Sequence, residues 1–227
     1  MLNDNGSKLL ALDVDDVLVH ISTPWIERLM LRPQLAFALP KLMGRTASDG
    51  LQDEVIARQH PHIQQWLQAH HDLPAGLLGQ VDLTYRGDPN FYDDLPPTTF
   101  CKGIAAIMDL PGRISHIHIV THNFSNSDPS VASKERWLRK QLGGPERVTI
   151  HNLEAGQKKS EILQKFCPEP NAFADDSMKN VIDMLLNDAV RPHEILIPRM
   201  GHNELIPEIQ QLAFLRRISI NYYENVV

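Results

Sequence analysis

The feature that most limits how this chain can fold is an apolar run near its start that leads directly into carboxylates. Residues 8–14 read as one strand, and Asp13, Asp15 and Asp16 follow one another at its end. A run that is apolar on both sides is typical of a parallel sheet covered by helices on both faces. Carboxylates this close together repel one another, so a proton or a cation is expected among them.

Further apolar runs repeat this pattern along the chain. They cover residues 114–120, 171–174 and 194–197, with a weaker run at 147–150. Apolar residues at helical spacing predict helices between these runs, over residues 103–109, 133–142, 160–166 and 177–186. Strands and helices that alternate in this way predict an α/β fold with a Rossmann-like, doubly wound parallel sheet.

The segment from about residue 20 to residue 95 has no convincing strand pattern. Its apolar residues fall at helical spacing, and its prolines stand near plausible helix starts or breaks. Pro96 and Pro97 then restrict the backbone at the point where this segment ends and the chain returns to the strand-and-helix pattern. We therefore expect a core domain built from residues 1–19 and 96–227, into which residues 20–95 are inserted as a helical domain.

The composition narrows the classes of partner. A formal net charge of −6 and a pI near 6.0 give no basic surface to neutralise a row of phosphates, so extended nucleic acid is not expected. No stretch approaches the roughly 20 apolar residues that span a bilayer, and the N-terminus has no secretory pattern. Cys101 and Cys167 lack the spacing of a disulfide framework or a zinc site. We expect a soluble, cytoplasmic protein without membrane contact.

Polar side chains follow the carboxyl ends of the predicted strands. In chain order they are Asp13 and Asp15, then Thr121, His122 and Asn123, then Lys158 and Lys159, and finally Asp175 and Asp176. Parallel α/β sheets bind ligands beyond the carboxyl ends of their strands, so we expect these groups on one rim. Carboxylates fit a hard divalent cation such as Mg²⁺, and a hydroxyl and an ammonium group fit the oxygens of a phosphate.

Two histidines offer a different kind of metal site. His116 and His118 alternate on one face of a predicted strand, and imidazole nitrogens are ligands of zinc. The sequence shows no third ligand at a defined spacing. Burial of both histidines in hydrogen bonds is therefore the favoured interpretation.

Four motifs together resemble those of the haloacid dehalogenase superfamily of phosphohydrolases. They are Asp-x-Asp-x-x-Leu after a strand, Thr at the end of a later strand, Lys before the helix KSEIL, and Asp-Asp-x-x-x-Asn after another strand. The helical segment after the first motif lies where that family inserts a cap over the active site. A less specific likeness, to the 5′(3′)-deoxyribonucleotidase branch, is carried by DVDDVL, LPGRISHIHIVTHN, KERWLRKQLG and ILIPRMGHN.

The resemblance implies a Mg²⁺-dependent phosphomonoester hydrolase that works through an aspartyl phosphate. It assigns Asp13 as the nucleophile and Asp15 as the general acid and base. Mg²⁺ would be held by Asp13, the main-chain carbonyl of Asp15, and Asp175, while Asp176 and Asn180 would orient the metal's surroundings. The implied phosphate-binding residues are Thr121, His122, Asn123 and Lys159.

The substrate and some assignments stay open at this point. A (deoxy)nucleoside monophosphate is the leading substrate, a sugar phosphate or another small phosphorylated metabolite is the runner-up, and a non-catalytic binding or regulatory protein of the same fold is a third interpretation. A homodimer is compatible with all three. Where the family often has Gly-Thr, this chain has Asp16-Val17. Lys158 precedes Lys159, and we favour Lys159 because it begins the predicted helix in the family-like register.

Overall fold

The computed structural model describes residues 8–21, 87–123, 126–154, 156–198 and 206–224. Within them a six-stranded sheet runs in the order β3-β2-β1-β4-β5-β6, and every neighbouring pair of strands is parallel. The strands are β1 (Lys8–Leu12), β2 (Ile114–His122), β3 (Val148–Leu153), β4 (Ala172–Ala174), β5 (Glu194–Pro198) and β6 (Ser219–Tyr223). The predicted α/β class with a parallel sheet is confirmed, and the strand order is consistent with a Rossmann-like fold.

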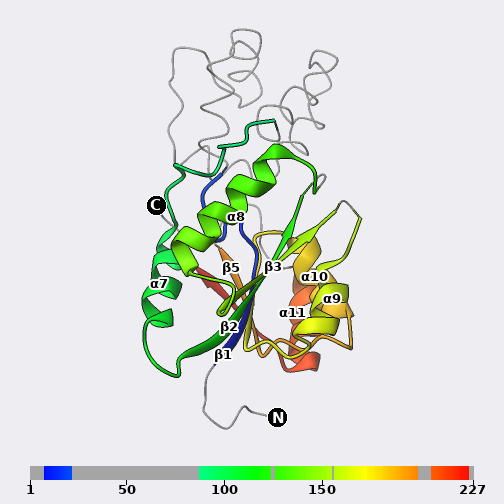
Figure 1. Ribbon diagram of the computed structural model, residues 1–227. Helices are drawn as coiled ribbons and strands as arrows, with labels where there is room; N and C mark the ends of the chain where they lie inside the picture. The colour runs from blue at the N-terminus through cyan, green and yellow to red at the C-terminus, as the bar shows by residue number, and fades with distance from the viewer. Residues whose placement is uncertain (1–7, 22–86, 124–125, 155, 199–205, 225–227) are drawn as a thin grey trace, which may run out of the picture.

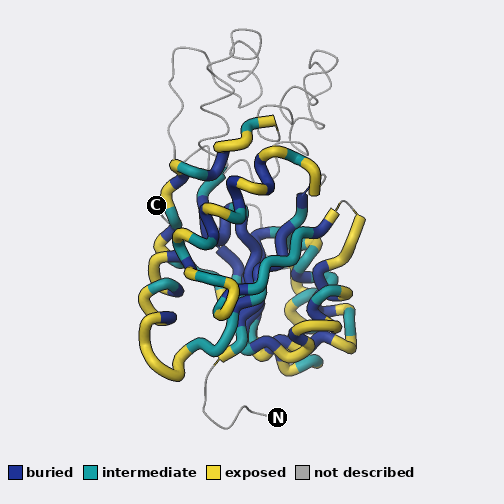
Figure 2. Tube along the Cα trace, viewed as in Figure 1, coloured by how far each residue is buried: buried dark blue, intermediate teal, exposed yellow. Residues whose placement is uncertain are grey.

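Helices cover both faces of the sheet (Figure 1). They are α7 (Thr99–Met108), α8 (Pro129–Leu142), α9 (Lys159–Phe166), α10 (Met178–Leu186) and α11 (Pro207–Arg216). Two separate apolar clusters show which helix lies on which face: α7 and α8 pack in one, and α9, α10 and α11 pack in the other. Figure 2 shows the buried residues concentrated along the strands between these two layers.

Two elements at the C-terminal end were not predicted. Helix α11 leaves Phe214 81% and Leu215 69% exposed, so its apolar residues do not form the one-sided stripe that marks an amphipathic helix. Strand β6 is a short edge strand beside β5, and its residues are only partly buried. Strand β1 is shorter than expected, because Asp13 and Val14 already belong to the turn that follows it.

Most of the expected helical insertion, residues 22–86, lies outside the described residues. The described end of that segment packs on the α8 side of the sheet, where Phe91, Tyr92 and Leu95 join the apolar cluster. Trp137 of α8 donates its indole N–H to the carbonyl of Leu95 at 2.8 Å, which fixes this segment against the core.

Two further expectations, on membrane-spanning helices and on the two cysteines, can be compared with the described residues. None of the helices there is long and apolar enough to cross a bilayer. Cys101 and Cys167 are both buried and unpaired as thiols, on α7 and at the end of α9. Burial raises the pKa of Cys101 to about 12 and that of Cys167 to about 11, so both thiols stay protonated and unreactive at neutral pH.

Candidate active site

The acidic residues lie where the strand order reverses, between β1 and β4. Asp13 directly follows β1, and Asp175 and Asp176 directly follow β4. The backbone N–H of Asp13 donates to the carbonyl of Ala174 at 2.9 Å, which holds the two strand ends together. One carboxylate oxygen from each of Asp13, Asp175 and Asp176 lies within 4.8 Å of the others. Doubly wound sheets bind ligands at this crevice.

A tight turn after β1 carries the next two carboxylates. The N–H groups of Leu18 and Val19 both donate to the carbonyl of Val14, at 2.8 and 3.1 Å. Asp16 adopts a left-handed conformation with φ 55°, which favours glycine but which aspartate tolerates better than most residues. Its side chain is buried and accepts from the N–H of Ile21 at 3.2 Å, so Asp16 supports the turn.

The Asp15 carboxylate is held through both of its oxygens. Tyr92 donates its hydroxyl to Oδ1 at 2.7 Å, and Lys134 of α8 donates Nζ to Oδ2 at 2.9 Å. The same Nζ donates to the hydroxyl oxygen of Thr121, at the end of β2, at 3.2 Å. Burial raises the pKa of Asp15 and the charge of Asp13 raises it further, while Lys134 and Tyr92 act in the opposite direction; the net shift is upward.

Lys159 joins the two strand ends electrostatically. It is buried at the start of α9, and its Nζ lies 2.8 Å from Asp13 Oδ1 and 2.8 Å from Asp175 Oδ2. Burial lowers the pKa of Lys159, but the two carboxylates outweigh burial and hold the pKa above its usual value. Lys158 is 63% exposed and lies 3.6 Å from Asp183, so only Lys159 contacts these two carboxylates.

Asp175 is the most fully bonded carboxylate of the group. It accepts from the backbone N–H of Ser177 at 2.9 Å and from the side-chain amide of Asn180 at 3.0 and 3.2 Å, in addition to Lys159. Burial nevertheless raises its pKa above the usual value. The pKa of Asp176 is raised well above its usual value, first by burial and then by Asp175, Asp13 and Asp16. Asp176 thus belongs to the cluster itself, and Asn180 supports it from outside.

Among the described residues, the charges of the cluster do not balance. Five carboxylates, Asp13, Asp15, Asp16, Asp175 and Asp176, lie around two buried ammonium groups, those of Lys134 and Lys159, and the imidazole of His20 lies 3.7 Å from Asp16. Full ionisation would leave an uncompensated negative charge in a buried site, which is unfavourable unless protons or a cation are taken up. The donors are all carboxylate oxygens, so a hard divalent cation fits them.

A tyrosine beside the cluster also points to a missing partner. The hydroxyl of Tyr223, at the end of β6, is buried and has no hydrogen-bond partner among the described residues. Burial, together with the charges of Asp176, Asp175 and Asp13, raises its pKa, so the phenol stays protonated and remains a donor. An oxygen bound at the carboxylates, from water or from a ligand, is the kind of acceptor that this hydroxyl requires.

His122 and Asn123 bond to neighbouring loops and to β3. His122 donates Nε2–H to the carbonyl of Gln157 at 2.8 Å. The amide of Asn123 donates to Asn126 at 3.2 Å and to Asn152 of β3 at 3.0 Å. Both residues therefore brace the loops beside the site in this arrangement.

Sequence reasoning missed Tyr92, Lys134 and Tyr223. Tyr92 lies in the segment predicted to be part of the insertion, and Tyr223 lies in a strand that was not predicted. The position of Lys134 in the sequence did indicate that it is buried. Lys134 stands three residues before Trp137 and four before Leu138, on the stripe of α8 that faces the core. A lysine on a buried stripe needs an anionic partner, and Asp15 is that partner.

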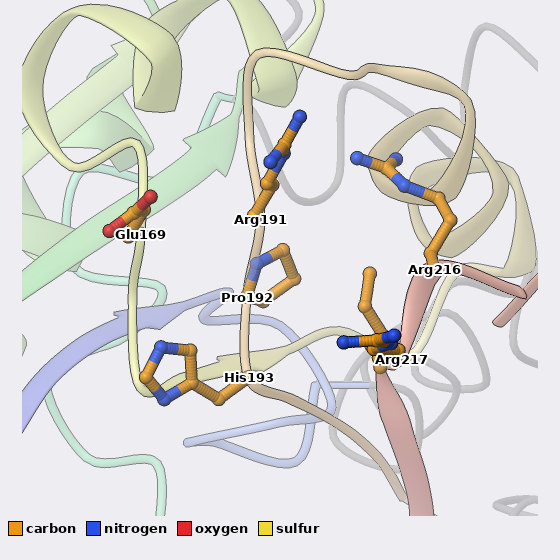
Figure 3. Close-up of a pocket in the computed structure, with 7 residues that line it drawn as sticks. Glu169, Arg191, Pro192, His193, Arg216 and Arg217 are labelled. Atoms are coloured by element: carbon orange, nitrogen blue, oxygen red, sulfur yellow. The ribbon is translucent and has the colours of Figure 1, made fainter. Parts of the chain in front are cut away.

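A separate hollow lies at the opposite end of the sheet (Figure 3). It has a volume of about 270 Å³ and is lined by Glu169, Arg191, Pro192, His193, Arg216, Arg217 and Ile218. These residues precede β4, β5 and β6, so the hollow faces the amino ends of the strands. Arg216 donates to the carbonyls of Met184 and Leu185 at 3.0 and 2.6 Å, which satisfies the end of α10. The carboxylate cluster is the candidate active site, and this hollow is remote from it.

Comparison of the chain with protein-family models and with curated proteins finds no match in either. The chemistry of the site is therefore argued from its own residues.

Proposed function

We propose that this chain is a Mg²⁺-dependent phosphomonoester hydrolase of the haloacid dehalogenase type that acts on a (deoxy)nucleoside monophosphate. The observation that carries the proposal is a pair of carboxylates two residues apart that are each bound by a buried lysine but have different further partners. Asp13 lies against Lys159 at 2.8 Å, whereas Asp15 lies between Tyr92 and Lys134 at 2.7 and 2.9 Å. Such differences in environment separate a nucleophile from an acid-base group.

The residues that would hold the metal are Asp13, Asp175 and Asp176, whose oxygens already converge. When bound, Mg²⁺ would supply positive charge that reduces the repulsion between the carboxylates and an incoming phosphate. Asn180 and the N–H of Ser177 fix the orientation of Asp175 through its Oδ1. Such support around a ligand sets its direction and basicity.

In the first half of the reaction, a carboxylate oxygen of Asp13 attacks phosphorus and the ester P–O bond breaks. Asp15 gives its proton to the leaving oxygen, which departs as an alcohol. The raised pKa of Asp15 favours the protonated form that this step needs. Thr121 and Lys159 bind phosphoryl oxygens as negative charge spreads over them.

In the second half, water attacks the aspartyl phosphate. Asp15, now ionised, removes a proton from the water while the water oxygen bonds to phosphorus. The bond between phosphorus and Asp13 breaks, which releases phosphate and regenerates both carboxyl groups. Tyr92 and Lys134 keep Asp15 in one orientation through both transfers.

The choice of a nucleotide rests on the sequence likeness to deoxyribonucleotidases, which is weaker support than the carboxylate chemistry. A sugar phosphate is the second substrate class, and turnover decides between the two. A non-catalytic binding protein of the same fold would have no use for Asp15 as a proton carrier. Loss of activity on changing Asp15, without loss of phosphate binding, separates an enzyme from a binding protein.

The test is phosphate release from a panel of nucleoside 5′- and 3′-monophosphates and sugar phosphates, with Mg²⁺ and with EDTA. Wild-type protein is compared with Asp13→Asn and with Asp94→Asn, in which an exposed aspartate outside the site is changed. We expect Mg²⁺-dependent turnover that Asp13→Asn abolishes and Asp94→Asn retains. Full activity in Asp13→Asn, or none in the folded wild type on any substrate, would refute the proposal.

A further inference from the structure

A second group of potential metal ligands lies on the sheet, away from the carboxylates. His116 and His118 are two residues apart on β2, so their side chains project from the same face. They pair with Leu9 and Ala11 of β1, which places them level with the body of that strand rather than at its carboxyl end. From the sequence alone, no third ligand for these two histidines could be identified.

The neighbouring edge strand supplies the third histidine. His151 of β3 brings its Nε2 to 3.1 Å from Nδ1 of His118, with the two rings nearly parallel at 9°. The ring of His116 lies 5.0 Å from that of His118, and its Nε2 is 2.8 Å from the hydroxyl oxygen of Thr149. The ring of His118 therefore contacts both His116 and His151, and the three imidazoles lie on one face of two paired strands.

The spacing of the first two nitrogens is close to that of metal ligands. Zinc–nitrogen bonds of about 2.0–2.1 Å at a tetrahedral angle place two ligand atoms about 3.3 Å apart. The observed 3.1 Å is close to this separation, and binding requires both rings to turn so that the two nitrogens face an ion beside the line that joins them. Only one of the two nitrogens carries the proton that lies between them, so metal binding at both requires that ring to carry its proton on its other nitrogen instead.

The surroundings of the three rings leave them partly exposed. All three histidines are half-buried, and the ring of His151 also packs against Phe166, with the ring centres 4.9 Å apart. A neutral imidazole presents one nitrogen lone pair, as a metal ligand must.

We propose that His116, His118 and His151 bind a divalent transition-metal ion of the Zn²⁺ class on the β2–β3 side of the sheet. His118 and His151 are the first two ligands, and His116 becomes the third when its ring turns away from Thr149. Among the described residues, only the carboxylates place three ligand atoms within 4.8 Å as they stand, so this rotation is a required part of the proposal. Nitrogen donors favour Zn²⁺ over Mg²⁺, which distinguishes this site from the carboxylate site.

Co²⁺ is the probe that separates the two sites, because tetrahedral nitrogen coordination gives intense visible absorption and octahedral oxygen coordination gives weak absorption. The full-length chain is titrated with Co²⁺ and then with Zn²⁺, as wild type and as Asp175→Asn. We expect intense bands in both proteins that Zn²⁺ removes. Only weak bands in the wild type, or bands that disappear in Asp175→Asn, would overturn the proposal without any histidine being changed.

Three further variants identify the ligands. His118→Gln should weaken Zn²⁺ binding at least about tenfold, since even residues that only support metal ligands contribute 10–100-fold. His193→Gln, at an exposed histidine before β5, is the matched control and should bind as the wild type does. Thr149→Val removes the partner of His116 and should tighten binding. Unchanged affinity in His118→Gln, or in Thr149→Val, would contradict the assignment.

Discussion

The change of Lys134 to methionine tests whether charge compensation holds the site together. Lys134 is only 1% exposed, and its ammonium group binds Asp15 at 2.9 Å and Thr121 at 3.2 Å. It also lies 5.1 Å from the centre of the Tyr92 ring. Methionine keeps most of the side-chain volume, so the variant removes the charge and its bonds with little change in packing.

The expected loss of stability follows from the charges. Among the described residues, the five carboxylates and two ammonium groups of the cluster have a formal sum of −3, which becomes −4 in the variant. Removing one partner of a buried ion pair costs about 3–5 kcal/mol. The Asp15 side chain is 23% exposed, so solvent reduces the effect, and we expect a loss of about 2–3 kcal/mol in unfolding free energy at pH 8.

The loss should depend on pH in a defined direction. Lys134 lowers the pKa of Asp15 against burial, so its removal raises that pKa further above the usual 3.8. A carboxyl group whose pKa is raised by folding is favourable when protonated and becomes unfavourable as pH rises through the folded pKa. The variant is therefore expected to be closer to the wild type at pH 5 than at pH 8.

Urea unfolding in EDTA at both pH values measures this effect. Lys140→Met, which changes an exposed lysine on the same helix, is the control and should cost less than about 1 kcal/mol. If Lys134→Met is as stable as this control at pH 8, or loses more stability at pH 5 than at pH 8, the account of charge compensation is wrong.

Three other predictions concern the site and the core. Tyr92→Phe removes one of the bonds that orient Asp15 and should lower kcat about 10–100-fold; steady-state kinetics that show a change in KM alone would argue against an orienting role. Burial raises the pKa of Asp175 and Asp176, so Mg²⁺ binding should release protons and its affinity should increase from pH 5 to pH 8. Calorimetry in two buffers detects this proton release. Binding that does not depend on pH would contradict the prediction. Cys101 and Cys167 should react with a thiol reagent much more slowly in the folded protein at pH 8 than in denaturant, since burial raises the pKa of both thiols to about 12 and 11; rapid labelling of both in the folded state would contradict their burial.

The sequence was a good guide to the fold where burial is two-sided. Strands β1, β2, β4 and β5 lie between helix layers, and their continuous apolar runs marked them. The edge strand β6 has a neighbouring strand, β5, on one side only, and its residues are only partly buried. Its sequence is therefore less apolar and carried no clear strand pattern. Helix α11 was missed for a related reason, because only Ala213 of that helix is buried.

The candidate site could be predicted in part because parallel topology forces strand ends onto one edge. Asp13, Thr121 and Asp175 are brought to that edge by the strands that precede them, and sequence alone locates those strands. The contacts to Asp15 could not be found in this way. Tyr92 is 77 residues from Asp15 along the chain and Lys134 is 119, and neither stands at a strand end. Such contacts depend on how α8 lies across the sheet, which no local pattern specifies.

An apolar strand that runs into several carboxylates is stable only if positive charge or protons offset the repulsion between those carboxylates. Lys134 and Lys159 provide fixed positive charge, one beside Asp15 and the other between Asp13 and Asp175. Burial, together with the neighbouring carboxylates, still raises the pKa of Asp15, Asp175 and Asp176 above the usual value, so protons or a cation are favoured in the cluster. A divalent ion would displace protons from Asp175 and Asp176, which lie within reach of it, but the two bonds to Asp15 keep that carboxyl apart. In the proposed mechanism, Asp15 then still exchanges a proton when the other carboxylates are neutralised, as general acid-base chemistry requires.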